Sequence, residues 1–235
     1  MIMGLAKLRF RYLQYWLKKS TYLRFQQVWS SYATTEKMSI QEIGRFPRIA
    51  EILTPINPRQ IIDLGGNAGA LIEYLDQNRI SELEEYIVLD YDDGAIEIGR
   101  SLWKQKIKSQ SKQQKSVEIN FYYFDFANPW LSNFAPPLEK RITADVVIAL
   151  ALTHHLILGQ HMDISTLINR FQSMTKKFLL VEFMPFGLAV GDKNSKIPEW
   201  YTLDWFREHL RSKFTIISEE KLEINRILLV AELKS

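Results

Sequence analysis

The chain has 235 residues, of which 46% are hydrophobic and 24% charged, so it can bury a large core without metal or disulfide support. It contains no cysteine, which excludes disulfides, thiolate zinc sites and a cysteine nucleophile. The net charge of +3 is too small to indicate nucleic-acid binding, and no apolar run is long enough to span a bilayer. We expect no signal peptide, and the lack of cysteine agrees with the cytoplasmic location that we expect.

The first 57 residues predict a helical cap or lid. Residues 5–28 carry apolar side chains near helical spacing, and residues 38–54 predict a second helix that Pro55 and Pro58 end. Trp29 and Tyr32 lie between these helices, where aromatic side chains could line the pocket of a substrate. The plainer alternative is that both residues pack the helices onto the rest of the fold.

The N-terminus has a marked charge pattern. Residues 1–25 hold six basic residues and no acidic one. A helix of this kind could make weak contact with an anionic membrane surface, an acidic carrier protein or a partner chain. Its basic side chains could also simply face water. The sequence does not decide the oligomeric state.

Residues 58–235 predict one α/β domain, because short apolar segments alternate with amphipathic helical ones. Helices are predicted at residues 70–77, 93–106, 164–175 and 203–211. Strands are predicted at residues 59–64, 86–90, 118–124, 144–149, 178–183, 214–219 and 226–232. The last two are joined by a short polar turn, which favours an antiparallel hairpin. The expected sheet therefore has seven strands and is mostly parallel.

A glycine-rich turn, Gly65-Gly66-Asn67-Ala68-Gly69, joins the first strand to the next helix. Glycine permits a tight turn and close approach of a ligand, and the helix N-terminus offers free N–H groups. Such groups suit a carboxylate as well as a phosphate, while Asp63 at the strand end can accept from an ammonium. The pattern therefore indicates a site for an amino-acid tail, with a purely structural βα turn as the alternative.

Polar residues also follow the next three strands. Asp90 ends the second strand at the spacing where an acid binds a ribose diol, and Tyr91 follows it. Asp125 after the third strand can accept from the amine of adenine, with Phe126 packing on the ring. Ala149 ends the fourth strand, which is expected to point into the same cleft. Each acid could instead be a solvated strand end or a turn cap.

Two adjacent histidines, His154 and His155, follow the fourth strand and are candidate general bases. One of them could instead cap a helix or make a structural hydrogen bond. Together with His161 they lack the spacing and the carboxylate cluster of a metal site, so we expect no metal. Glu182 at the end of the fifth strand is expected at the edge of the same cleft, where it could orient a histidine, bind a polar acceptor or pair with a nearby lysine.

From about residue 59 to the end, the chain resembles the class I, Rossmann-like methyltransferases that use S-adenosylmethionine. The segment 63–69 is similar to their first motif, acid-x-Gly-x-Gly-x-Gly, with Asn67 in place of the middle glycine. Asn67 tolerates a left-handed backbone, so the loop shape can survive. By the same resemblance, Asp90 matches the ribose-binding acid and Asp125-Phe126 the adenine pocket. The segment Ala151-Leu-Thr-His-His-Leu156 is similar to a subgroup with an Ala-Leu-x-His-His-Leu motif.

The resemblance implies S-adenosylmethionine as cofactor, with Gly65, Gly66 and Gly69 contacting its methionine part. It further implies methyl transfer, foremost to oxygen, onto a small-molecule or carrier-borne acceptor of specialised metabolism. Trp200 and Tyr201 would line the base of a second cover over residues 186–201. The alternatives are a non-catalytic nucleoside-binding subunit, an N- or C-methyltransferase, and a dinucleotide oxidoreductase. The last would prefer Gly-x-Gly-x-x-Gly, which this loop lacks.

Overall fold

A computed structural model of the chain describes residues 40–77, 80–109, 117–126, 138–188 and 197–235. The predicted helix over residues 5–28 lies outside these ranges, as do Trp29 and Tyr32. Within the described ranges, no helix is long and apolar enough to cross a membrane.

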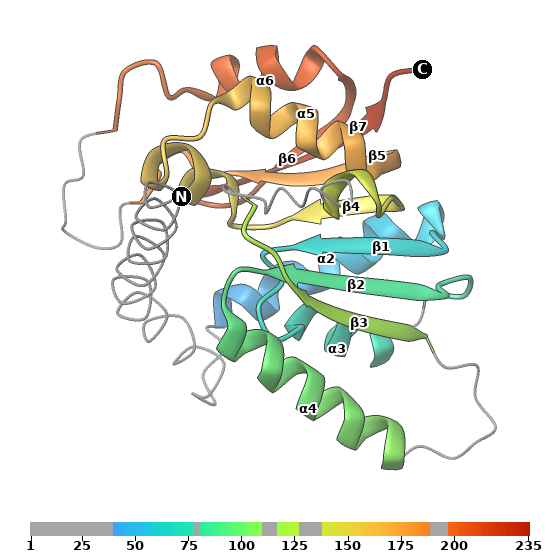
Figure 1. Cartoon of the computed structure of the whole chain (residues 1–235). Coiled ribbons are helices and arrows are strands. Elements are labelled where there is room, and N and C mark those ends of the chain that lie inside the picture. The colour runs from blue at the N-terminus through green and yellow to red at the C-terminus, as the bar shows by residue number, and fades with distance from the viewer. Residues whose placement is uncertain (1–39, 78–79, 110–116, 127–137, 189–196) are drawn as a thin grey trace, which may run out of the picture.

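The strands of the described residues form one seven-stranded sheet in the order β3-β2-β1-β4-β5-β7-β6 (Figure 1). Neighbours among β1 to β5 pair in parallel, whereas β7 is antiparallel to both β5 and β6. The predicted mostly parallel sheet with its C-terminal antiparallel hairpin is confirmed. The strands are β1 (Gln60–Leu64), β2 (Glu85–Asp90), β3 (Glu118–Tyr123), β4 (Ala144–Ala149), β5 (Thr175–Phe183), β6 (Phe214–Glu223) and β7 (Arg226–Leu233).

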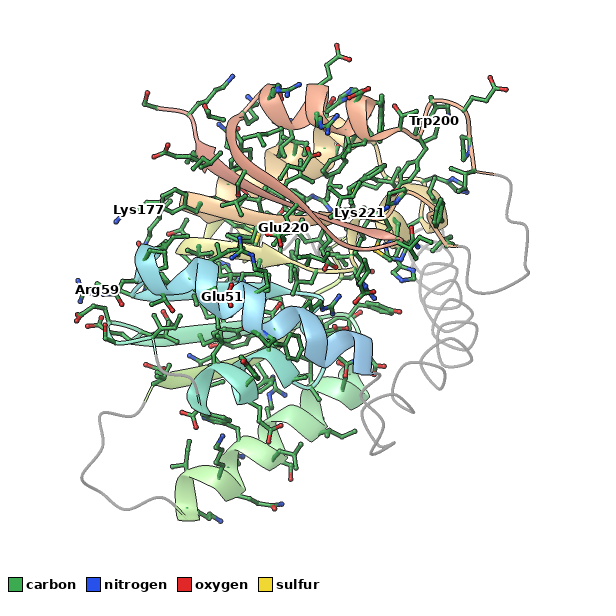
Figure 2. The ribbon with its side chains drawn as sticks, turned by 180° about the vertical axis from the view of Figure 1, so that it is seen from behind. Glu51, Arg59, Lys177, Trp200, Glu220 and Lys221 are labelled. Atoms are coloured by element: carbon green, nitrogen blue, oxygen red, sulfur yellow. The ribbon has the colours of Figure 1, made fainter. Side chains whose placement is uncertain are left out.

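Helices cover both faces of the sheet. They are α2 (Ile40–Ile56), α3 (Ala70–Gln77), α4 (Asp93–Ser109), α5 (Ile164–Met174) and α6 (Leu203–Arg211), and a π-helical turn runs from His155 to Gly159. Successive residues of each central strand face opposite sides of the sheet. Ile61 of β1 therefore packs with α2 and α3, while Ile62 packs with α5 and α6. Figure 2 shows α2 running across the first of these faces.

The helix α2 ends later than predicted. Pro55 was expected to terminate it, but the helix includes Pro55 and ends at Ile56. Asn57 then takes a left-handed φ of 49°, and its N–H donates to the Leu53 carbonyl at 2.8 Å. The stop is therefore a left-handed cap rather than the proline itself.

The strand order reverses between β1 and β4. The chain runs from β1 outward to β2 and β3 and then returns to β4 on the other side of β1. Loops that leave the carboxyl ends of such strands diverge, and open α/β sheets bind ligands at that point. The carboxyl ends of the parallel strands lie at the left edge of the sheet in Figure 1.

Candidate functional site

The loop between β1 and α3 has three residues with left-handed backbone. Gly65, Asn67 and Gly69 have φ values of 72°, 51° and 85°. The Asn67 side chain supports this shape, because its Oδ1 accepts from the Ala68 N–H at 2.8 Å. Asparagine at the position of the middle glycine thus keeps the tight turn that the sequence predicted.

Gly66 makes room for the buried carboxylate of Asp63. A Cβ atom at position 66 would lie 2.6 Å from Asp63 Oδ2 and 2.9 Å from a methyl group of Val88. The Tyr86 hydroxyl donates to the same Asp63 oxygen at 2.8 Å, and Asp63 is only 3% exposed. Burial raises the pKa of Asp63 to about 6, although the Tyr86 bond and the charge of Arg45 oppose this shift.

Asp90 joins the loops that follow β1 and β2. Its Oδ2 accepts from the Asn67 N–H and its Oδ1 from the Asp92 N–H, both at 2.9 Å. A carboxylate has about four lone-pair sites, so each oxygen can still accept a hydroxyl. Burial raises the pKa of Asp90 to about 6, while the two amide donors act in the opposite direction.

Asp125 lies in the same group of side chains. The pKa of Tyr91 is raised to about 12, chiefly by burial and then by the nearby charges of Asp90, Asp92 and Asp125. The ends of β2 and β3 also meet directly, since the Phe124 N–H donates to the Asp90 carbonyl at 2.7 Å. The structure therefore brings together the predicted ribose and adenine acids around Tyr91.

Phe126 is buried in the core on the α5 side of the sheet. Its ring packs edge-on against Phe124 and tilted against Phe171, with centroid separations of 5.7 Å in both pairs. The Arg170 guanidinium lies 5.5 Å from the Phe126 ring centre. Contact of this ring with adenine stays a prediction.

The turn after β4 lies against the glycine loop. Ala149 is fully buried at the end of β4, and Ala151 has a φ of 50°. Leu152 approaches Gly65 so closely that a Cβ atom on Gly65 would be 3.2 Å from its Cδ1. The first and fourth strand ends therefore meet.

The two histidine rings pack at a tilt against each other at the start of the π-helical turn. Their ring centres lie 4.0 Å apart, and His154 is 5% exposed, whereas His155 is partly exposed. Burial, followed by the nearby His155 and Arg226, lowers the pKa of His154 to about 3, and burial also lowers that of His155. Both imidazoles are therefore neutral near pH 7. Across the described ranges, no three His, Asp or Glu side chains are grouped to hold a metal ion.

Glu182, expected at the edge of the cleft, is instead fully buried between two arginines. Its Oε2 accepts from Arg45 and Arg226 at 3.1 Å each and from the Ala151 N–H at 2.7 Å. The sequence left pairing with a lysine as an alternative role for Glu182. That alternative is wrong, because both charged partners are arginines. Sequence reasoning missed them, although Arg45 stands one helical turn before Ile49 on the inner side of α2, where a basic residue is unusual.

Trp200 and Tyr201 form an aromatic group beside the end of β5. Tyr201 is buried and stacks on Phe183, with ring centres 4.9 Å apart. Trp200, labelled in Figure 2, is 50% exposed. Its ring centre lies 4.9 Å from that of Trp205. The Tyr201 hydroxyl has no hydrogen-bond partner among the described residues, and burial raises its pKa. The structure thus brings this pair to the same edge of the sheet as the histidines.

Comparison with known proteins gives a curated relative and solved structures of similar fold. No protein-family model matches the chain. Nodulation protein NoeA of Rhizobium meliloti strain 1021 is 27% identical over 168 residues, which are 68% of this chain and 32% of that protein. The chain thus matches about a third of the length of this curated relative.

Two solved structures show the fold. The N-methyltransferase NodS from Bradyrhizobium japonicum, in complex with S-adenosylhomocysteine, aligns over 89% of this chain and 98% of its own, with a TM-score of 0.57 and 13% identity. Human N-acetylserotonin methyltransferase, in complex with S-adenosylmethionine, aligns over 91% of this chain and 56% of its own, with a TM-score of 0.51 and 18% identity. The chain therefore has the Rossmann-like fold of class I methyltransferases.

Proposed function

We propose that the chain is a methyltransferase that uses S-adenosylmethionine. The observation that carries this proposal is the bond from the Asn67 N–H to Asp90 Oδ2, which joins the glycine loop to the acid of β2. The buried Asp63 lies under the same loop, and Asp125 lies beside Tyr91 on the next strand end. An amino-acid tail, a ribose and an adenine require donors and acceptors in this order along the strand ends.

The residues present fit this cofactor. The backbone of Gly65, Gly66, Asn67 and Gly69 and the N-terminus of α3 would hold the methionine part, whose ammonium Asp63 attracts. Asp90 would accept the ribose hydroxyls and Asp125 the adenine amine, with Tyr91, Phe126 and Ala149 closing the pocket.

When bound, the cofactor supplies a methyl group that is already activated by its attachment to a sulfonium. The protein has to align the acceptor with this carbon, exclude water and remove a proton. For a hydroxyl acceptor, a neutral imidazole would take the proton that the hydroxyl gives up when it receives the methyl group. His155 is better suited than His154 to take it, because His154 is more deeply buried and its pKa is lowered to about 3.

The acceptor is proposed to be a small molecule or a group on a carrier. Trp200 and Tyr201 would form an aromatic wall for it beside the end of β5. The Tyr201 hydroxyl, which no described residue bonds, could bind its polar group. Trp29 and Tyr32 are proposed to complete this wall from the N-terminal cap. Glu182 does not belong to this aromatic wall, because its side chain is fully buried.

Titration calorimetry with S-adenosylhomocysteine tests the proposal. The wild-type chain should bind it, and Asp90→Ala should largely abolish binding. Asp92→Asn is the matched control, because the Asp92 side chain accepts from Gly94 and Ala95 at the start of α4 through one oxygen that asparagine retains. Absence of binding to the wild-type chain would refute the proposal. Binding without any transfer of labelled methyl to cell-extract fractions would favour the non-catalytic alternative.

A further inference from the structure

Glu182 binds three separate parts of the chain with one oxygen. Arg45 comes from α2, Arg226 from β7, and the Ala151 N–H from the turn after β4. The other carboxylate oxygen, Oε1, has no hydrogen-bond partner among the described residues. Glu182 stands two residues after Leu180 on β5, so both side chains face α2, on the same side as Asp63 in β1.

The turn after β4 is attached to Glu182 at two points. Besides the bond from the Ala151 N–H, the Thr153 hydroxyl donates to the Glu182 carbonyl oxygen at 2.8 Å. Ala151 has a left-handed backbone, which costs energy for a residue with a Cβ atom and persists only where its surroundings enforce it. Leu152 stands between these two attachments, and its side chain lies against Gly65. His154 follows Thr153 directly.

Stability alone is a weak reason for such a cluster. Taking a carboxylate and guanidinium groups out of water is costly, and an apolar replacement of equal volume is often neutral or stabilising. The bonds of Glu182 do fix geometry, because they join α2, β5, β7 and the β4 turn at one atom. Arg45 also lies close enough to Asp63 to favour its charged form.

We infer that Glu182 is a positioning residue, which holds the turn after β4 against the glycine loop and links that turn to α2 through Arg45. This inference rests on the proposed function, since the glycine loop is the proposed methionine site. Glu182 touches neither cofactor nor acceptor. It acts through Ala151 and Leu152, which set the shape of the loop surface and the start of the histidine segment.

Two changes that loosen the turn test this inference. Glu182→Ala removes every bond to Oε2, and Thr153→Val removes the second attachment while nearly preserving shape, in case the first variant does not fold. Glu182→Ala should weaken binding of S-adenosylhomocysteine about tenfold, and Thr153→Val should weaken it less. Adding Ala151→Gly to Glu182→Ala should restore most of this loss, because glycine adopts a positive φ without steric cost. A merely structural role would not give this rescue.

The control is Glu219→Gln, which changes another arginine–glutamate pair between a helix and a strand, Arg207 of α6 with Glu219 of β6. Its affinity should equal that of the wild type. Amide hydrogen exchange of the unliganded protein provides a readout that does not need the cofactor. Residues 150–156 and 65–69 should exchange faster in both turn variants than in the wild type. Their exchange should be unchanged in the control. If the wild type does not bind S-adenosylhomocysteine, the proposed function is refuted, while the exchange measurement still tests the positioning role. Wild-type affinity and exchange in the variants, or no rescue by Ala151→Gly, would overturn the positioning role.

Discussion

The backbone N–H of Asn67 donates to Asp90 Oδ2 at 2.9 Å, so the acid that ends β2 holds the loop after β1. The other oxygen of Asp90 accepts from the Asp92 N–H, which fixes the carboxylate from both sides. A ribose bound by Asp90 would thus lie against a loop whose shape depends on the same side chain. Substitutions in the loop and at Asp90 should therefore both affect binding of the cofactor.

Asn67 offers the first test of this dependence. Its φ of 51° suits glycine or asparagine but is a true outlier for a β-branched residue. Asn67→Val should strain the loop by roughly 1–3 kcal/mol and weaken S-adenosylhomocysteine binding about tenfold or more. Asn67→Gly loses only the bond from Ala68 and should bind within about threefold of the wild type. Calorimetric titration measures both, and equal affinities for the two variants would contradict the prediction.

Gly66 provides the second test. A methyl group here would lie 2.6 Å from Asp63 Oδ2, so Gly66→Ala must displace the buried carboxylate and disturb its bond from Tyr86. We expect the free energy of unfolding to fall by about 1–3 kcal/mol and cofactor binding to weaken strongly. Gly44→Ala in α2 is the control, because its added methyl meets nothing within 4 Å. It should stabilise the protein by about 0.5–1 kcal/mol in chemical denaturation. Destabilisation by both variants alike would remove the steric argument.

The strand and helix pattern and the loop were predictable because each depends on residues that are near in sequence. Apolar runs such as residues 144–149 match β4 at both ends, and the glycines around Asn67 specify their turn locally. The error at Pro55 is also local, because the helix is ended by the left-handed backbone of Asn57 and the prediction considered the prolines instead.

The buried cluster of Glu182 could not be read from the sequence. Arg45 and Arg226 stand 137 and 44 residues away from it, and their pairing depends on how α2 and β7 pack against β5. The proton affinity of His154 was equally out of reach. A sequence shows that a histidine is present, but its pKa depends on burial and on neighbours such as Arg226.

The raised pKa of Asp90 predicts how cofactor binding depends on pH. The ribose hydroxyls would favour the charged carboxylate, so binding is strong above the pKa and is lost as the pH falls through it. Because burial raises this pKa to about 6, affinity for S-adenosylhomocysteine should fall about tenfold between pH 7 and pH 5. An ordinary aspartate would show this loss only near pH 4. Titrations at several pH values check the position of the transition. A constant affinity down to pH 5 would exclude Asp90 as a ribose ligand that must be charged.

The histidine pair can be separated by substitution. His155→Ala should lower the methyl-transfer rate about 100-fold or more while leaving S-adenosylhomocysteine affinity unchanged, because a general base acts on the acceptor and not on the cofactor. His161→Asn is the control, since it removes an exposed histidine with a φ of 54° that asparagine tolerates. The rate is measured with labelled cofactor at saturating concentration, on the acceptor fraction of a cell extract that accepts label from the wild type. Because burial lowers the pKa of His155, the neutral base should persist below pH 6.5, and the saturated rate should hold there. A rate that His155→Ala leaves intact would place the base elsewhere.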